Sequence, residues 1–257
     1  MVNIFRGRTV YLAIMEKENI KVLYEDDELL VLEKPAGWVT TKENYQLQIT
    51  NYELSPKGTS EGAKNKNKYL EDWVGEYYPN KLLRHGIVHR LDKGTSGMVV
   101  VAKTEESLIE LKRQFKQRLV RKRYYAVVCG DLSKVGEVDM PINRSRYTFG
   151  KFKVSEEGKR AVTEFEVIKK FKINGRVFSV VDINLKTGRT HQIRVHFSYL
   201  GWPLLGDKVY GGQVIDILQR PFLHAYKLEF SHPVSQKQML FQSEMAADLQ
   251  KVLEIYG

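Results

Sequence analysis

The sequence predicts an α+β domain with a mixed, largely antiparallel sheet, flanking helices and a central cleft. Apolar runs of strand length come in pairs joined by short polar turns, which is typical of β-hairpins. Segments with helical periodicity are short and lie between strands, without the regular strand–helix alternation of a parallel sheet. The chain has 257 residues, of which 42% are hydrophobic, so we expect a substantial buried core.

The N-terminal half begins with a predicted hairpin. Its strands are Val22–Glu25 and Leu29–Glu33, separated by an acidic turn. Residues 40–68 are rich in Asn, Lys, Ser, Gly and Thr and lack periodicity, which predicts a long flexible loop. A helix-like segment, Tyr69–Tyr77, follows, and the apolar run Met98–Ala102 predicts a buried strand.

A helix with one buried face is predicted over Glu105–Val120. Its apolar positions recur at spacings of three and four, at Leu108, Leu111, Phe115 and Leu119. The rest of this helix and its exit are rich in Lys and Arg, and the exit leads directly into a predicted strand at Tyr124–Val128. We therefore expect a basic surface beside that strand.

The C-terminal half is predicted to hold a second hairpin. The strands Thr163–Phe171 and Arg176–Leu185 flank Asn174-Gly175, which is a strong signal for a two-residue β-turn. The last predicted elements are the strand Phe222–Phe230 and the helix Ala246–Ile255, with Leu249, Val252 and Leu253 facing inward.

Another helix is predicted at His191–Leu200. Thr190 is its expected N-cap and Gly201 its C-terminal stop. The turn at Gly188–Thr190 is expected to direct backbone N–H groups toward an anion, because helix N-termini attract negative charge.

Composition favours a polyanionic partner and excludes several classes of site. The chain has 41 Lys and Arg against 31 Asp and Glu, a net charge of +10. Cys129 is the only cysteine, so neither an intrachain disulfide nor a Cys-based zinc site can form, and we expect a reducing, cytoplasmic location. Neither the histidine spacing nor the glycine pattern matches a metal or nucleotide motif, so we expect no metal and no cofactor. We also expect no membrane span, because no apolar run approaches the ~20 residues required.

The segment His89–Gly97, with the sequence HRLDKGTSG, carries the main chemical signal. It places Asp92 near Arg90 and ahead of a Gly-Thr-Ser-Gly turn that leads into the buried strand. An Asp at a loop edge is usually a cap or a surface ion pair. Here two glycines permit unusual backbone angles, and His, Arg, Thr and Ser offer many donors. The pattern predicts a binding turn that contains a nucleophile or a base.

This segment resembles the signature of the RluA family of RNA pseudouridine synthases. Four further segments are similar to family motifs and occur in the expected order: EKPAG at 33–37, YYAVVCG at 124–130, TGRTHQIRVH at 187–196 and GWPLLGD at 201–207. The resemblance covers about residues 22–233. It implies the pseudouridine synthase fold and a single catalytic domain at 21–257 after an N-terminal extension at 1–20. We expect no separate S4-type RNA-binding module, because only about 20 residues precede the family pattern.

The resemblance also implies the catalytic residues. Asp92 matches the essential aspartate, which acts on the ribose or on the base and must be ionised. Burial would disfavour that charge, so a buried cation should accompany it, and Arg194 is our choice, with an ordinary surface arginine as the alternative. Tyr124 matches the active-site tyrosine. Its neighbour Tyr125 should face the other side of the strand, because side chains alternate.

RNA contacts are expected from several basic and polar residues. An enzyme that acts on a base in folded RNA must first expel that base from its stack, and Arg90 is placed to fill the gap. His89 is expected to bond locally and shape the turn. The other candidates for RNA or loop contacts are Lys34, Arg189, His191, Arg113, Lys116 and Arg121. For Lys34, Arg189 and His191 a structural role is an equal alternative. The 40–68 loop is either a solvated insertion or a flap ordered by RNA.

The predicted function is therefore isomerisation of specific uridines to pseudouridine in structured RNA, by a cofactor-free monomer. Large-subunit ribosomal RNA is the first expectation for the substrate, because Gly86–Lys93 resembles that branch of the family, while transfer RNA or dual specificity stays open. A catalytically silent RNA-binding protein that uses the same cleft is the alternative from another class. An Asp-dependent glycosidase would need a second catalytic carboxylate, and none stands out near Asp92.

Overall fold

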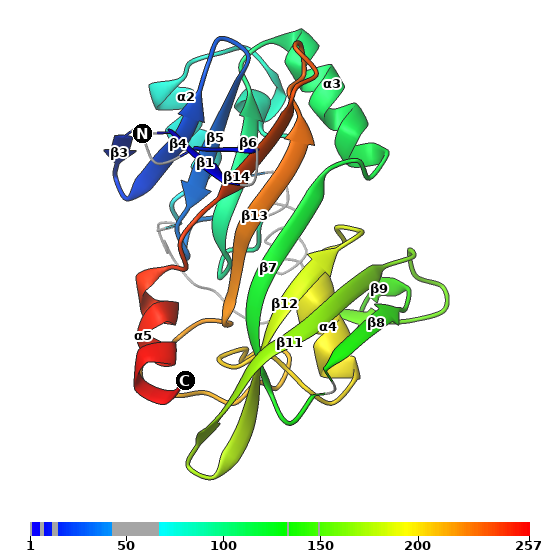
Figure 1. Cartoon of the computed structure of the whole chain (residues 1–257). Helices are drawn as coiled ribbons and strands as arrows, with labels where there is room; N and C mark the ends of the chain where they lie inside the picture. Colours follow the sequence, from blue (N-terminus) through cyan, green and yellow to red (C-terminus); the bar gives the residue numbers. More distant parts are fainter. Residues whose placement is uncertain (1, 6–7, 12–14, 43–66, 133, 149) are drawn as a thin grey trace, which may run out of the picture.

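The computed structural model describes residues 2–5, 8–11, 15–42, 67–132, 134–148 and 150–257. Most of the predicted 40–68 loop lies outside these residues. The described chain forms one long sheet with the strand order β3-β4-β5-β6-β13-β7-β12-β11-β8 (Figure 1). Within this path the β6–β13 pair is parallel and the other pairs are antiparallel. The mixed, largely antiparallel α+β prediction is thereby confirmed.

The first half of the chain builds one end of the sheet. Its strands are β1 (Val2–Phe5), β2 (Arg8–Tyr11), β3 (Met15–Lys17), β4 (Ile20–Glu25), β5 (Leu29–Lys34) and β6 (Ser96–Ala102). Its helices are α2 (Leu70–Tyr77), the 3-10 turn η1 (Leu83–Gly86) and α3 (Glu105–Lys116). The predicted first hairpin is present as the antiparallel pair β4–β5. The β1–β2 hairpin joins the sheet through parallel bridges between β2 and β14.

The second half of the chain supplies the remaining strands, two of which form a separate two-stranded sheet, while the last one pairs beside the N-terminal hairpin. Its strands are β7 (Arg121–Cys129), β8 (Val135–Asp139), β9 (Ile142–Arg144), β10 (Phe152–Val154), β11 (Val162–Ile173), β12 (Arg176–Leu185), β13 (Leu223–Ser231) and β14 (Gln238–Gln242). Its helices are α4 (Gln192–Tyr199) and α5 (Ala247–Tyr256). The β11–β12 hairpin turns at Asn174 and Gly175, which both have positive φ, 49° and 79°. The Asn-Gly prediction is confirmed, because this turn requires the left-handed region at both residues.

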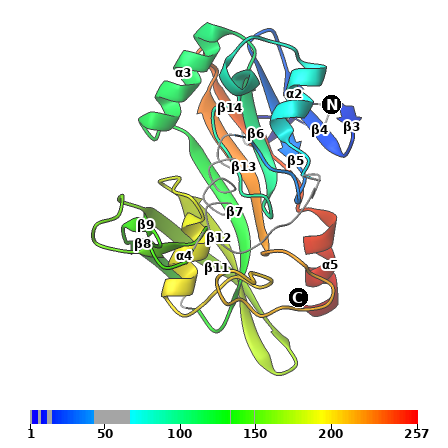
Figure 2. The same ribbon diagram turned by 180° about the vertical axis from the view of Figure 1, so that it is seen from behind.

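Helices cover both faces of the sheet, because neighbouring strand residues are buried on opposite sides. Val100 packs in the cluster that contains Leu108 of α3, whereas Val99 and Val101 pack in the cluster that contains Trp73 of α2. Figures 1 and 2 show α4 against β11 and β12, and α5 at the opposite side of the lower part of the sheet. The long strands β7 and β13 connect the two ends and form the floor between them.

Two predicted boundaries were wrong. The helix predicted to Val120 ends at Lys116, because Arg118 adopts φ 62° and breaks the helical path. Leu119 therefore does not follow the helical spacing and is 55% exposed instead of buried. The later helix is capped by His191, with φ 55° and no side-chain cap bond, and not by Thr190. Gly201, with φ 84°, ends it as predicted.

Candidate active site

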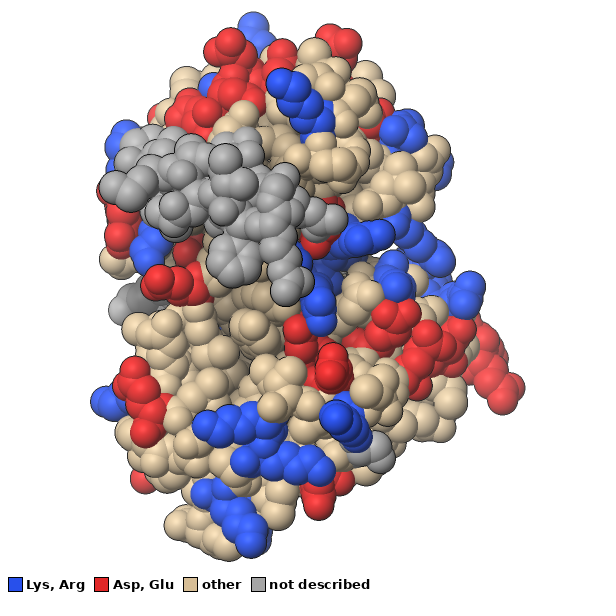
Figure 3. Space-filling view, viewed as in Figure 1, with Lys and Arg blue, Asp and Glu red and all other residues tan. Residues whose placement is uncertain are grey.

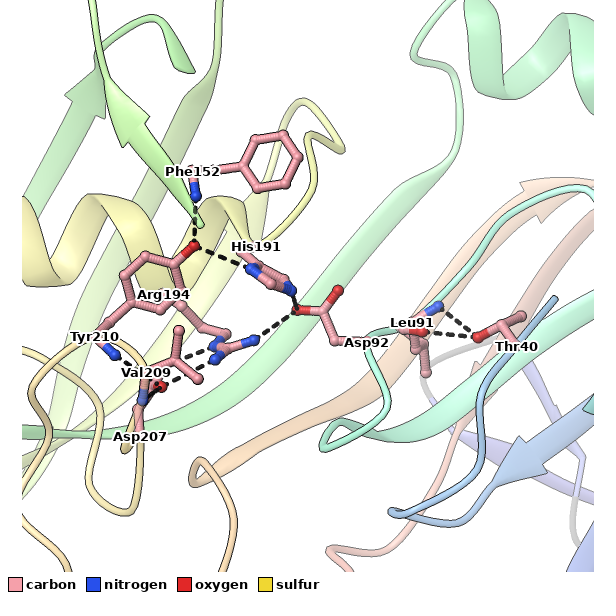
Figure 4. A network of polar contacts seen from close by, with 9 residues as sticks. All are labelled: Thr40, Leu91, Asp92, Phe152, His191, Arg194, Asp207, Val209 and Tyr210. Carbon is pink, nitrogen blue, oxygen red and sulfur yellow. Dashed lines mark hydrogen bonds and ion pairs between the residues drawn. The ribbon is translucent and has the colours of Figure 1, made fainter. Parts of the chain in front are cut away.

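The loop that carries Asp92 is held by hydrogen bonds to residues 37–40, which follow β5. The Thr40 hydroxyl donates to the Leu91 carbonyl at 2.7 Å and accepts from the Leu91 N–H at 3.1 Å (Figure 4). The Gly37 N–H donates to the Lys93 carbonyl at 2.7 Å, and the Thr95 N–H donates to the Asp92 carbonyl at 3.0 Å. The backbone on both sides of Asp92 is therefore fixed before any substrate binds.

Arg194 lies between two carboxylates. Its Nε and Nη2 bind Asp207 Oδ2 and Oδ1 at 2.7 and 2.9 Å, and its Nη1 lies 3.6 Å from Asp92 Oδ2 (Figure 4). Burial by itself lowers the pKa of Arg194, but the Asp207 hydrogen bonds and the charges of Asp92 and Asp207 raise it above its usual value. The guanidinium stays charged and presents its remaining edge to Asp92.

Asp207 orients this guanidinium. Its side chain is fully buried, and its Oδ1 also accepts from the backbone N–H groups of Val209 and Tyr210 at 3.1 and 3.2 Å. Asp207 is the last residue of the motif at 201–207, but it was not among the predicted site residues. The signal that could have found it was the prediction of a buried arginine, because a buried guanidinium requires more than one acceptor.

His191 immediately precedes α4, and its ring faces Asp92. Its Nε2 lies 3.9 Å from Asp92 Oδ2, and its Nδ1 lies 3.0 Å from the Tyr210 hydroxyl. The same hydroxyl accepts the Phe152 N–H at 2.9 Å (Figure 4). Burial lowers the pKa of His191 despite the nearby Asp92, so the ring is neutral at pH 7. The tautomer of the ring decides whether Nδ1 accepts from or donates to the Tyr210 hydroxyl.

Tyr124 and Tyr125 lie on opposite faces of β7, as predicted. Tyr124 lines the pocket in front of Asp92, and its side chain is mostly buried. Burial and the charge of Asp92 raise the pKa of Tyr124, so the phenol keeps its proton. Tyr125 instead stacks on Tyr226 behind the sheet, with ring centroids 3.8 Å apart.

These groups open into a cavity of about 590 Å³ between α3, β7 and the turn before α4. Seven of its lining residues are Lys or Arg, whereas Asp92 is the one lining carboxylate among the described residues. Arg194 and Lys186 have acidic partners, the latter in Glu164 at 3.0 Å. In the part of the chain that the structure describes, no carboxylate lies within 4.0 Å of the other five, which are Arg90, Lys116, Arg118, Lys122 and Arg189. Figure 3 shows Lys and Arg gathered around a hollow at the waist of the molecule.

Two candidate residues, Lys34 and His89, are bonded within the protein. Lys34 is fully buried, and its Nζ donates to the Pro35 and Trp38 carbonyls, both at 2.9 Å. Desolvation outweighs the attraction of Asp92 and lowers the pKa of Lys34 to about 7. His89 borders the pocket, but its Nε2 accepts the Val100 N–H at 3.0 Å and its ring stacks on Phe115. Lys34 therefore has a structural role, whereas His89 is bonded within the turn, as predicted, and is still partly exposed at the cavity wall.

Two further candidates point away from the cavity. Arg113 is tied to Glu110 at 2.6 Å and to Gln117 on the exposed side of α3. Arg121 lies on β7 three positions before Tyr124, so it faces the opposite side of the sheet. Neither residue lines the cavity, whereas Lys116, Arg90 and Arg189 do.

The described residues contain no group of three or more His, Cys, Asp or Glu side chains arranged to hold a metal ion. None of the described helices is long and apolar enough to cross a membrane.

Comparison with known proteins gives this arrangement a family. The model of the RNA pseudouridylate synthase family matches residues 28–199, about two thirds of the chain. The chain belongs to this family. A protein of Zymomonas mobilis named ribosomal large subunit pseudouridine synthase D is 38% identical, with 92% of this chain and 72% of that protein covered. A protein of the same name from Nitrosomonas europaea is 38% identical over 91% of this chain and 64% of its own length.

Solved structures agree on the fold. Human RNA pseudouridylate synthase domain containing 1 aligns with a TM-score of 0.67 at 24% identity, over 94% of this chain and 97% of that chain. Human RNA pseudouridylate synthase domain containing 4 aligns with a TM-score of 0.64 at 22% identity, over 92% and 93%. The predicted pseudouridine synthase fold is confirmed.

Proposed function

We propose that this protein is an RNA pseudouridine synthase, an isomerase that detaches uracil from its ribose, turns it and rejoins it through carbon. One observation carries the proposal. The Asp92 carboxylate is paired with Arg194 and faces a pocket lined by Tyr124 and by five cations that have no acidic partner among the described residues. This combination offers one reactive group for the nucleoside and several positive groups for a phosphate backbone.

Asp92 is the proposed catalytic group, acting either as a nucleophile or as a base. Both roles require a carboxylate, and Arg194 compensates its charge while Asp207 fixes the arginine. Because the product is an isomer of the substrate, the hydrogen lost from carbon 5 of uracil is balanced by one gained at its freed nitrogen. No redox partner is needed. Tyr124 supplies a ring for the uracil and a protonated hydroxyl for proton transfer.

Arg90 is the proposed residue that replaces the target base in the RNA stack. It lines the pocket two residues before Asp92, and it has neither a hydrogen bond nor an ion pair with any described residue. A free guanidinium of this kind can stack on bases and pair with phosphates. His191 and Arg189 on the facing turn complete the entrance.

We infer that large-subunit ribosomal RNA is the substrate. The support comes from relatives named ribosomal large subunit pseudouridine synthase D, which cover most of this chain. The RNA and the uridine are to be identified by mapping pseudouridine with carbodiimide-dependent reverse transcription on total RNA. Cells that lack the gene should lose one or more positions, and wild type should restore them while Asp92→Ala should not. Restoration by Asp92→Ala would contradict the catalytic proposal and favour an RNA-binding role.

A further inference from the structure

Lys122 lies on the same face of β7 as Tyr124. The two residues are separated by one position, so strand alternation directs both side chains into the cavity, roughly 7 Å apart along the strand. Their neighbours Arg121 and Arg123 face the other side, where Arg123 binds Asp182 at 2.7 Å. Lys122 is thus the basic residue of β7 that shares the cavity with the proposed catalytic groups.

The Lys122 ammonium lies between the end of α3 and the turn before α4. Its Nζ is 5.9 Å from the centroid of the Phe115 ring on α3. On the opposite side, a Cβ added at Gly188 would lie 3.6 Å from Nζ, so the absence of a side chain at Gly188 leaves space beside the ammonium. No hydrogen bond or ion pair joins Nζ to any described residue. The group therefore faces the cavity with its donors unused.

The cavity around this ammonium is mostly basic. Its other charged or titratable lining residues are Lys116 and Arg118 at the end of α3, Lys186, Arg189, His191 and Arg194 on the facing side, Tyr124 on β7, and His89, Arg90 and Asp92 on the Asp92 loop. Burial and the charge of Arg118 lower the pKa of Lys122 to about 8. A partly buried cation without an acceptor is unfavourable in the free protein. An anion in the cavity would remove this penalty and would restore the pKa toward its ordinary value.

We propose that Lys122 binds a phosphate group of the RNA immediately beside the target uridine, in the space left open by Gly188. This inference rests on the proposed function and adds a specific phosphate site to it. A lysine suits the task because its compact charge can donate several hydrogen bonds to phosphate oxygens without requiring one orientation. The site would fix the register of the strand relative to Tyr124 and Asp92.

The test measures binding of a nine-nucleotide single-stranded RNA with one central uridine, by fluorescence anisotropy. Lys122→Met should weaken binding about tenfold, the effect of losing one charge-assisted contact, while Lys122→Arg should stay within threefold of wild type. Lys251→Met is the matched control, because Lys251 is exposed on α5, away from the cavity, and the same charge is removed. It should change binding less than twofold.

A second series locates the phosphate. Each RNA in it carries one uncharged methylphosphonate in place of one phosphate. For wild type, one position next to the uridine should weaken binding about tenfold, whereas the same change should weaken Lys122→Met less than twofold, because the two changes remove the same contact. Wild-type affinity should also fall between pH 7 and 9 as free Lys122 loses its proton, and Lys122→Arg should remove this dependence.

The outcomes separate the phosphate site from the proposed function. Equal binding by Lys122→Met and wild type, or equal losses at every methylphosphonate position, would overturn the phosphate site even if the enzyme is active. A Lys122-dependent phosphate without release of tritium from RNA tritiated at carbon 5 of uridine would support the site and contradict the isomerase. A wild type that binds none of these RNAs would overturn both.

Discussion

The two sides of the cavity differ in whether their charged side chains have partners of opposite charge. At the Asp92 side, Asp92, Arg194 and Asp207 form a continuous chain of ion pairs and hydrogen bonds. At the α3–β7 side, Lys116, Arg118 and Lys122 have no acidic partner among the described residues. Groups that carry out chemistry benefit from fixed partners, because their geometry is set before the substrate arrives. Groups that bind a polyanion must keep their donors free, because the ligand supplies the partner.

Asp92→Ala should produce the largest change on the paired side. Release of tritium from RNA tritiated at carbon 5 of uridine should fall by about 10⁴-fold or more, because the proposed reactive carboxylate is removed. Binding of the RNA should change little, because removing an anion from a positive cavity does not weaken its attraction for phosphate. Activity within tenfold of wild type would contradict the assignment of Asp92.

Asp207→Asn tests whether the pairing also stabilises the fold. We expect the free energy of unfolding in urea to fall by about 3 kcal/mol, because the buried Arg194 loses its main counter-ion. Asp139→Asn is the control, since Asp139 pairs with the exposed Arg160 and losing this solvent-screened ion pair should lower the free energy of unfolding far less. Equal losses of unfolding free energy in the two variants would contradict a larger stabilising role for the buried Asp207.

Tyr124→Phe removes one hydroxyl from the floor between the two sides. Activity should fall about 100-fold if that hydroxyl transfers a proton. Tyr125→Phe should retain wild-type activity, because Tyr125 stacks on Tyr226 on the far face of β7. A Tyr124→Phe enzyme with full activity would limit Tyr124 to stacking on the uracil.

The lowered pKa of Lys34 predicts how the free energy of unfolding depends on pH. Its pKa is about 7 in the folded protein and near 10.5 when unfolded, so between these values the unfolded chain binds more protons. Stability should therefore rise with pH above 7, by up to about 1.4 kcal/mol per unit. Urea unfolding at pH 7.0, 7.5 and 8.0 should show this slope in wild type and a flatter one in Lys34→Met. The same slope in both proteins would contradict the shift.

Arg113→Met should produce the smallest change. Arg113 is basic and lies on α3, but Glu110 and Gln117 already occupy its donors and it does not line the cavity. RNA binding should therefore change less than twofold, in contrast to the expected tenfold loss for Lys122→Met. A loss of RNA affinity as large as that of Lys122→Met would show that Arg113 contributes to RNA binding even though Glu110 and Gln117 occupy its donors.

Local sequence patterns predicted much of the fold. The hairpins β4–β5 and β11–β12 were predictable because turn chemistry and alternation act between near neighbours. Tyr124 could be separated from Tyr125 for the same reason. The end of α3 was not predictable from its apolar spacing, because the left-handed Arg118 interrupts a pattern that continues to Leu119 in the sequence.

The sequence by itself determined the α+β class, the hairpins and the position of Asp92 in a polar, glycine-containing turn. Only the tertiary structure decided which charges are paired. Asp207 approaches Arg194 through the turn after α4, and Lys34 is enclosed because the β5 turn folds over it. The physical reason is that burial and ion pairing depend on contacts between distant segments, whereas propensity, alternation and turn chemistry are local. Lys122 and Arg113 look alike in the sequence and differ only in what surrounds them in space.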